Sequence, residues 1–258
     1  MTTPARSTAR RSKWLKRMQP RPQAALRLIA LAHAGGGAST FRGWSAALPE
    51  DIEVVAVQLP GREERLSEAA LSSIAPLVTA LADELVLERD SPFALFGYSM
   101  GALIAFELCR ELRRRRAPMP VSLFAAAHRA PQVSMPVLGL HELSDEDFIA
   151  EVNRRYDAVP AAVLADQGLM ELLLPPLRAD MSVCDSYVYA AEDPFDVPIS
   201  AFGGADDHNV SRAELDAWAE QTTGAFASTV LPGDHFFMST ASQPLLAEVT
   251  RTLQESDA

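Results

Sequence analysis

One stretch of the chain decides its fold: Phe93-Ala94-Leu95-Phe96-Gly97-Tyr98-Ser99-Met100-Gly101-Ala102-Leu103-Ile104-Ala105-Phe106-Glu107. It begins as an apolar run, reaches a serine with a glycine two residues to either side, and continues at once with apolar residues at helical spacing. The pattern predicts a buried strand, a sharp turn with Ser99 at its apex, and a helix whose small residues Ala102 and Ala105 let it lie close on a sheet.

The G-x-S-x-G turn also predicts a reactive serine. Such a turn holds the serine backbone in a strained conformation and lifts the hydroxyl above the edge of the sheet. The amide of Met100 then lies at the helix N-terminus, where free N–H groups and the helix dipole stabilise a developing oxyanion. The alternative is an ordinary serine on a tight turn, which the flanking strand and helix disfavour.

Length and charge limit the classes of function. The 258 residues, 48% of them hydrophobic, suit a single α/β domain, which we place at residues 23–258 behind a basic arm at residues 1–22. Residues 1–27 contain eight arginines and lysines and no acid, whereas the whole chain carries a net charge of −11. Because nucleic-acid binding depends on a basic surface, this acidic body argues against a nucleic-acid partner.

Cysteine usage and hydropathy indicate the compartment. No apolar run approaches the roughly 20 residues of a membrane span, so we expect no membrane segment. The two cysteines, Cys109 and Cys184, provide neither a disulfide framework nor metal-ligand spacing, which is typical of a reducing compartment. We therefore expect a cytoplasmic protein, and we expect it to be a monomer. The segment from Arg10 resembles a twin-arginine signal, but cleavage behind the next apolar run would remove the first strand. An arm anchored on the body by Trp14 is the better interpretation.

Strand and helix patterns alternate along most of the chain. Besides the opening stretch, we predict buried strands at 26–31, 52–59, 121–127, 198–202 and 226–231, and helices at 71–88, 211–218 and 244–253. Between about 136 and 191 the alternation gives way to short helical segments, one capped by Ser144 and one from Leu169 that ends at Pro175. We expect this insertion to form a helical lid over the carboxyl edge of the sheet.

Two further loops contribute to the predicted site. A glycine-rich loop follows the first buried strand, and the amide of Ala34 in it would supply a second oxyanion donor. The same loop could cradle a phosphate, but the Lys-Ser/Thr pair of a P-loop is missing and G-x-G-x-x-G fails as well. A serine needs a base to take its proton, and that base needs an acid to fix its tautomer. His235, after the last strand, is the predicted base.

Two neighbouring aspartates compete for the role of the acid. Asp207 lies three residues after Gly204 and three before Val210, so we choose it, with Asp206 as the second choice. The order Ser99, Asp207, His235 is that of the α/β-hydrolase triad. A metal site built from these aspartates with His235 and His208 is a weaker alternative, because no further ligands follow at a known spacing, and we predict none.

The chain as a whole resembles type II thioesterases, the free-standing editing hydrolases of polyketide and non-ribosomal peptide assembly lines. The matching segments are Ala32-His33-Ala34-Gly35-Gly36, Gln58-Leu59-Pro60-Gly61-Arg62, Gly97-Tyr98-Ser99-Met100-Gly101, Leu177-Arg178-Ala179-Asp180 and Gly233-Asp234-His235-Phe236. The chain departs from the family at Tyr98, where His is frequent, and at Ala32, where Pro is frequent.

The resemblance implies an α/β-hydrolase fold and a function. The expected activity is hydrolysis of acyl groups from the phosphopantetheine arm of acyl or peptidyl carrier proteins, with no cofactor of the enzyme's own. His33, and Tyr98 before the nucleophile, are expected to line the acyl pocket. The alternatives are a carboxylesterase or lipase that acts on free oxygen esters with the same triad, and a non-catalytic module that binds acyl carriers.

Overall fold

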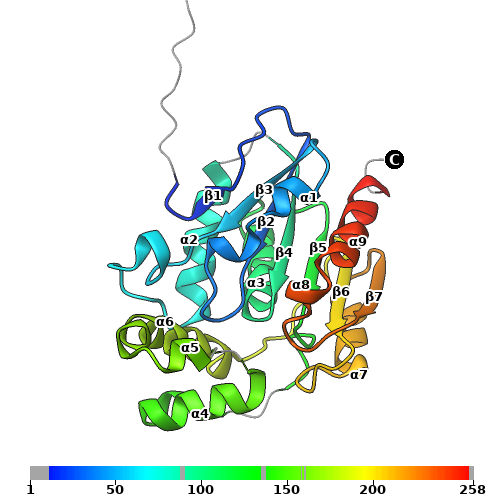
Figure 1. The fold of residues 1–258 in the computed structure, drawn as a ribbon. Helices are drawn as coiled ribbons and strands as arrows, with labels where there is room; N and C mark the ends of the chain where they lie inside the picture. Colours follow the sequence, from blue (N-terminus) through cyan, green and yellow to red (C-terminus); the bar gives the residue numbers. More distant parts are fainter. Residues whose placement is uncertain (1–11, 88–90, 135–137, 158, 160, 256–258) are drawn as a thin grey trace, which may run out of the picture.

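A seven-stranded sheet forms the centre of the molecule in a computed structural model that describes residues 12–87, 91–134, 138–157, 159 and 161–255 (Figure 1). The strands are β1 (Leu15–Arg17), β2 (Leu26–Leu31), β3 (Ile52–Val57), β4 (Phe93–Tyr98), β5 (Leu123–Ala126), β6 (Ile199–Gly204) and β7 (Phe226–Leu231). Their order is β1-β3-β2-β4-β5-β6-β7, with β1 antiparallel to β3 and the other described pairs parallel. The sequences of the central strands are continuous apolar runs because helices cover both faces of these strands.

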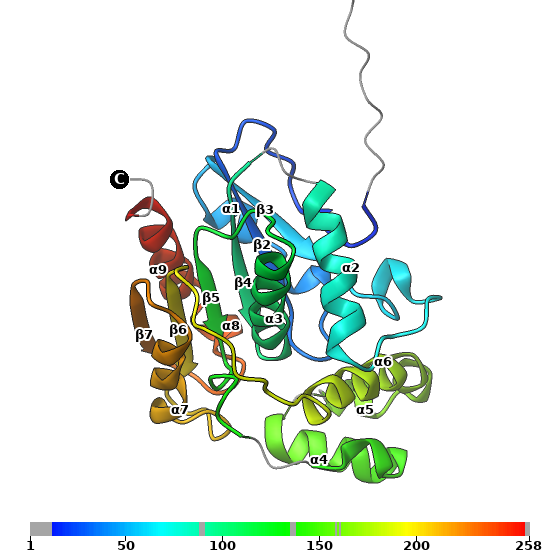
Figure 2. The ribbon, with the colours of Figure 1, turned by 180° about the vertical axis from the view of Figure 1, so that it is seen from behind.

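Helices flank the sheet on both sides and lie across the carboxyl ends of its strands. They are α1 (Trp44–Ala47), α2 (Ile74–Leu87), α3 (Met100–Arg114), α4 (Asp145–Tyr156), α5 (Ala161–Leu164), α6 (Gln167–Asp185), α7 (Arg212–Asp216), α8 (Phe237–Thr240) and α9 (Ser242–Glu255), with 3₁₀ turns η1 (Ala38–Phe41), η2 (Glu63–Arg65), η3 (Leu140–Glu142) and η4 (Ala217–Gln221). Helices α1, α8 and α9 cover the face seen in Figure 1, and α2 and α3 cover the face seen in Figure 2. The expected α/β architecture is confirmed.

Alternate residues of β4 belong to the two separate cores. Leu95 packs with α2 and α3 on one face, whereas Phe96 and Tyr98 pack with α1, α8 and α9 on the other. This alternation follows from the two-residue repeat of a strand. It decides on which side of the sheet each side chain near Ser99 lies.

Helices α4, α5 and α6 interrupt the alternation between β5 and β6, within the range 136–191 in which we predict the lid. Figures 1 and 2 both show them across the carboxyl ends of the strands. Helices α4 and α6 share with η3 a small apolar core of Leu140, Phe148, Val152, Leu177 and Met181. Ser144 caps α4 as expected, since its hydroxyl accepts a hydrogen bond from the amide of Asp147 at 3.2 Å.

The predicted end of a helix at Pro175 is wrong. Helix α6 continues through Pro175 and Pro176 to Asp185, although prolines cannot donate the hydrogen bonds that a helix interior uses. Beyond the prolines, Leu177, Asp180 and Met181 are buried against the lid core and the domain. Burial of these residues stabilises the second half of the helix despite the lost hydrogen bonds.

The described part of the basic arm adds a strand that the sequence did not indicate. Strand β1 pairs with β3, and the carbonyl of Trp14 accepts from the amide of Gln58 at 2.8 Å. The guanidinium of Arg65 lies 4.3 Å from the centre of the Trp14 ring, a cation–π contact. Trp14 therefore packs on the body of the domain, whereas residues 1–11 lie outside the described residues.

Among the described helices none is long and apolar enough to cross a membrane.

Candidate active site

Ser99 lies at the turn between β4 and α3 with a strained backbone. Its φ of 53° and ψ of −120° fall in a region that residues with a side chain rarely adopt. Both flanking glycines are required, because an added Cβ on Gly97 would collide with Gly101 and Ala102, and one on Gly101 would collide with the carbonyl of Leu31. The close crossing of strand and helix holds the serine at the edge of the sheet.

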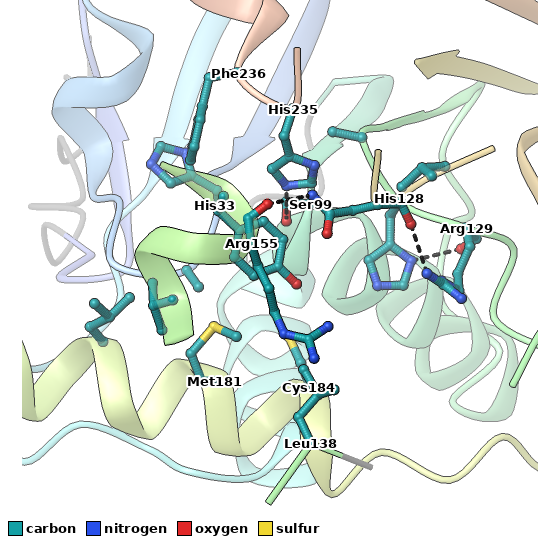
Figure 3. A pocket seen from close by; sticks show the side chains of 17 residues that line it. His33, Ser99, His128, Arg129, Leu138, Arg155, Met181, Cys184, His235 and Phe236 are labelled. Carbon is teal, nitrogen blue, oxygen red and sulfur yellow. Dashed lines mark hydrogen bonds between the residues drawn. The ribbon is translucent and has the colours of Figure 1, made fainter. Parts of the chain in front are cut away.

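The ring of His235 bridges Ser99 and Asp207. Its Nε2 lies 3.0 Å from Oγ of Ser99 (Figure 3), and its Nδ1 lies 2.9 Å from Oδ2 of Asp207. An ionised carboxylate can only accept, so Nδ1 carries the hydrogen and Nε2 is left to accept from the serine hydroxyl. This arrangement allows the serine proton to move to the histidine.

Of the two candidate acids, the structure brings Asp207 to the histidine. The side chain of Asp207 is buried and also accepts from the amide of Asn209 at 2.8 Å. Burial raises the pKa of Asp207, but its hydrogen bonds with His235 and Asn209 outweigh that effect and leave the pKa below its ordinary value. Asp206 is exposed, and its amide is bonded to the carbonyl of Gly233.

The two predicted oxyanion donors border the serine. Met100 is the first residue of the 15-residue helix α3, so its amide has no intrahelical acceptor. The amide of Ala34 has no acceptor among the described residues. The next amide along, that of Gly35, is occupied by Oδ2 of Asp180 at 2.7 Å. The loop thus leaves the Ala34 donor free for a ligand.

A buried ion pair that sequence reasoning missed supports this loop. Arg62 donates to both oxygens of Asp180, at 2.5 and 2.8 Å, and to the carbonyl of Gly36 at 3.2 Å. Both side chains are nearly inaccessible, at 5% and 1% exposure. Because Asp180 belongs to α6, the pair ties the helical insertion to the glycine-rich loop. Both residues belong to segments that match the type II thioesterases, but no local pattern pairs residues 118 positions apart.

A pocket opens beside Ser99, and we name it the acyl chamber (Figure 3). Its walls come from the glycine-rich loop, the ends of β5 and β6, and the inserted helices. They comprise His33, Ala34, Ser99, Ala127, His128, Arg129, Leu138, Val152, Arg155, Tyr156, Leu177, Met181, Cys184, Asn209, Val210, His235 and Phe236. Most of these side chains are apolar, which suits a hydrocarbon ligand.

Histidine and tyrosine rings surround the base. His33 lines the chamber as expected and packs edge-on against Phe236, with ring centres 5.3 Å apart. Burial, followed by the nearby charges of His235 and Arg62, lowers the pKa of His33 to about 4, so this ring is neutral near pH 7. Tyr156, from the end of α4, packs on the His235 ring at 5.0 Å and was not found from the sequence.

The prediction that Tyr98 lines the acyl chamber does not agree with the structure. Its side chain is fully buried on the α8–α9 side of the sheet and is absent from the chamber wall. The hydroxyl donates to the carbonyl of His235 at 2.5 Å and accepts from the amide of Met238 at 3.3 Å. Strand alternation explains the error, because Tyr98 shares its face with Phe96.

His208 does not join the site. It is exposed, as is Asp206, and the described residues contain no group of three side chains placed to hold a metal ion.

The chain is similar over most of its length to known thioesterases. A family model described as thioesterase domain matches residues 26–256. Gramicidin S biosynthesis protein GrsT of Aneurinibacillus migulanus is 42% identical over 243 residues, which cover 94% of each chain. Thioesterase PikA5 of Streptomyces venezuelae is 34% identical over 231 residues, which cover 88% of this chain and 80% of that one.

A solved structure is similar over almost the same length. The type II thioesterase BorB from the borrelidin biosynthetic cluster superposes with a TM-score of 0.85 at 34% identity. The superposition covers 95% of this chain and 99% of BorB.

Proposed function

The chain belongs to the thioesterase domain family, and on that premise we propose that it releases acyl groups from carrier proteins with Ser99 as nucleophile, His235 as base and Asp207 as acid. One observation carries the proposal: the His235 ring lies within hydrogen-bond distance of both other side chains, at 3.0 and 2.9 Å. The relatives that match it nearly end to end include a gramicidin S biosynthesis protein and a type II thioesterase from the borrelidin biosynthetic cluster, which supports an editing role in polyketide or non-ribosomal peptide assembly.

The first half of the reaction is acyl transfer to the enzyme. Oγ of Ser99 attacks the thioester carbonyl carbon while Nε2 of His235 takes its proton. The amides of Met100 and Ala34 stabilise the negative oxygen of the tetrahedral intermediate. The carbon–sulfur bond then breaks, and His235 returns the proton to the departing thiolate of the phosphopantetheine arm.

The second half releases the acyl group as a free acid. His235 takes a proton from a water molecule, whose oxygen attacks the acyl carbon of the Ser99 ester. Collapse of this second intermediate returns the proton to Oγ. Protein groups supply nucleophile, base and oxyanion donors, so the chemistry requires no metal or redox cofactor; the phosphopantetheine belongs to the carrier-protein substrate.

A competition between substrates tests this function. The purified protein is offered one acyl group as a carrier-protein thioester, as a coenzyme A thioester and as a nitrophenyl ester. We expect the highest kcat/KM for the carrier-protein thioester, because the partner's surface adds binding energy. Preference for the free oxygen ester would instead assign the protein to the carboxylesterases.

A further inference from the structure

A second cavity lies behind the acyl chamber, and we name it the rear cavity. Its lining combines apolar and aromatic residues, among them Leu103, Val133 and Tyr189, with polar ones, among them Gln132 and Asp185. It opens to the surface at Val188, which is exposed. The acyl chamber and the rear cavity share three lining residues, His128, Arg129 and Cys184. These three side chains therefore form the wall between the two spaces.

His128 supplies the aromatic part of this wall. It follows β5 directly after Ala127, whose φ of 53° turns the chain out of the strand. Its carbonyl accepts from Nε1 of the buried Trp218 at 2.9 Å, which fixes the backbone. Its Nδ1 lies 2.7 Å from the carbonyl of Arg129. A carbonyl only accepts, so Nδ1 carries the hydrogen and the ring is held in one orientation.

Arg129 and Cys184, the other two residues of the wall, are less suitable for substitution. Arg129 pairs with Glu214 at 2.7 Å and donates to the carbonyl of Asn209 at 2.7 Å, so its removal would disturb the loop that carries Asp207. Cys184 is a small side chain on α6. Of the two large side chains in the wall, the imidazole of His128 is the one that bonds neither to the triad nor to the loop that carries Asp207 (Figure 3).

We propose that the His128 ring sets the upper limit of acyl-chain length by closing the end of the acyl chamber against the rear cavity. This inference rests on the proposed function, which places the acyl group of the substrate in that chamber. A chain that fits in front of the ring is hydrolysed, whereas a longer chain meets the ring before its carbonyl reaches Ser99. Without the ring the two spaces become one, and a longer chain can extend past position 128 towards Leu103 and Val133.

The test compares wild-type protein with His128→Ala and His128→Ser across N-acetylcysteamine thioesters from acetyl to dodecanoyl. The ratio of kcat/KM for the longest to the shortest thioester should rise at least about tenfold in the variants, because each methylene that gains an apolar wall adds about fourfold. Circular dichroism and the unfolding midpoint identify which variants are folded. An unchanged length profile in either folded variant overturns the proposal.

A variant that fills the rear cavity provides the matched control. Val133 is a rear-cavity residue that does not line the acyl chamber, so Val133→Phe alone should leave the wild-type profile unchanged. In combination with His128→Ala it should restore the preference for short chains. A double variant that keeps the long-chain activity would show that the added length is accommodated elsewhere and would overturn the proposal.

Different results contradict the proposed function and the proposed length limit. If the wild-type protein hydrolyses no thioester, including the carrier-protein form, the proposed function fails. If it hydrolyses thioesters and the His128 variants leave the length profile unchanged, only the length limit fails.

Discussion

The hydroxyl of Tyr98 donates a 2.5 Å hydrogen bond to the backbone carbonyl of His235, so the residue before the nucleophile holds the loop of the base. The same hydroxyl accepts from the amide of Met238 at 3.3 Å, just beyond that loop. Two contacts on a buried ring thus fix the position of His235 relative to Ser99. Tyr98 is therefore a positioning residue for His235, and it does not line the acyl chamber.

Replacement of Tyr98 by phenylalanine should lower kcat and stability together. Tyr98→Phe leaves a buried carbonyl and a half-buried amide without their partner, which costs about 1–3 kcal/mol of unfolding free energy. A loosened His235 should reduce kcat about tenfold to a hundredfold, with the preference among acyl chains unchanged. Steady-state kinetics and urea unfolding measure both effects.

Tyr187→Phe is the matched control for this prediction. Its hydroxyl donates to Glu107 at 2.7 Å, away from the triad, so it should affect stability and leave kcat near the wild-type value. A changed chain-length preference in Tyr98→Phe would show that the ring does reach the acyl group.

The two neighbouring aspartates should respond differently to the same substitution. Asp207→Asn removes the acceptor that fixes the His235 tautomer, and kcat should fall by about 10⁴-fold, as in other triads. Asp206→Asn changes an exposed side chain and should alter kcat by less than about twofold. Single-turnover kinetics on an acyl thioester measure both. A larger loss from Asp206→Asn would reassign the acid.

The buried pair of Arg62 and Asp180 should matter to both stability and activity. Asp180→Ala leaves a buried guanidinium without its partner and should cost about 3–5 kcal/mol of unfolding free energy. Glu248→Ala, which breaks an exposed pair with Arg251, should cost less than about 1 kcal/mol. Chemical unfolding at pH 7 compares the two.

A double substitution separates the two roles of the pair. Replacement of both charges, Arg62→Met with Asp180→Leu, should recover much of the stability because no unpaired charge remains. It should leave kcat low, since the amide of Gly35 still lacks its carboxylate acceptor beside the oxyanion loop. Full recovery of kcat would show that the pair has no part in holding the loop.

Two half-buried histidines should make the fold sensitive to mild acid. Burial lowers the pKa of both His33 and His128 to about 4, whereas an unfolded histidine titrates near 6.5. Below pH 6.5 the unfolded chain therefore binds protons that the folded protein does not, and stability is lost as the pH falls towards 4. Each histidine should cost about 1.4 kcal/mol by pH 5.5.

Urea unfolding at pH 7.5 and 5.5 measures this effect. His128→Gln cannot take up a proton, so its loss of stability between the two pH values should be about 1.4 kcal/mol smaller than that of the wild type. An equal loss in both proteins would contradict a neutral, half-buried His128.

Local sequence patterns were sufficient for most of the sheet, for the helix after Ser99 and for the order of the triad loops. The apolar run before Ser99 and the helical period after it are short-range signals, and parallel strands bring their carboxyl ends to one edge of the sheet. Asp207 was preferred over Asp206 from the glycine and valine around it, and the structure places it against His235.

Long-range pairing and the side of a strand are harder to predict. The ion pair of Arg62 and Asp180 joins residues 118 positions apart, and β1 depends on an edge that β3 offers. Helix α6 passes Pro175 because residues beyond it are buried, which is tertiary and not local information. The orientation of Tyr98 could have been predicted from the sequence, since strand alternation places its side chain on the same face as Phe96 and on the opposite face to Gly97.

The central claim is that Ser99 carries the acyl group between the carrier protein and water. Intact-protein mass spectrometry of an acylated carrier protein, with wild-type enzyme or Ser99→Ala added in catalytic amount, tests it most directly. We predict that the wild type converts the carrier to its free-thiol form with a matching yield of acid, and that a folded Ser99→Ala leaves the acyl mass on the carrier. Deacylation by Ser99→Ala at the wild-type rate would contradict the account.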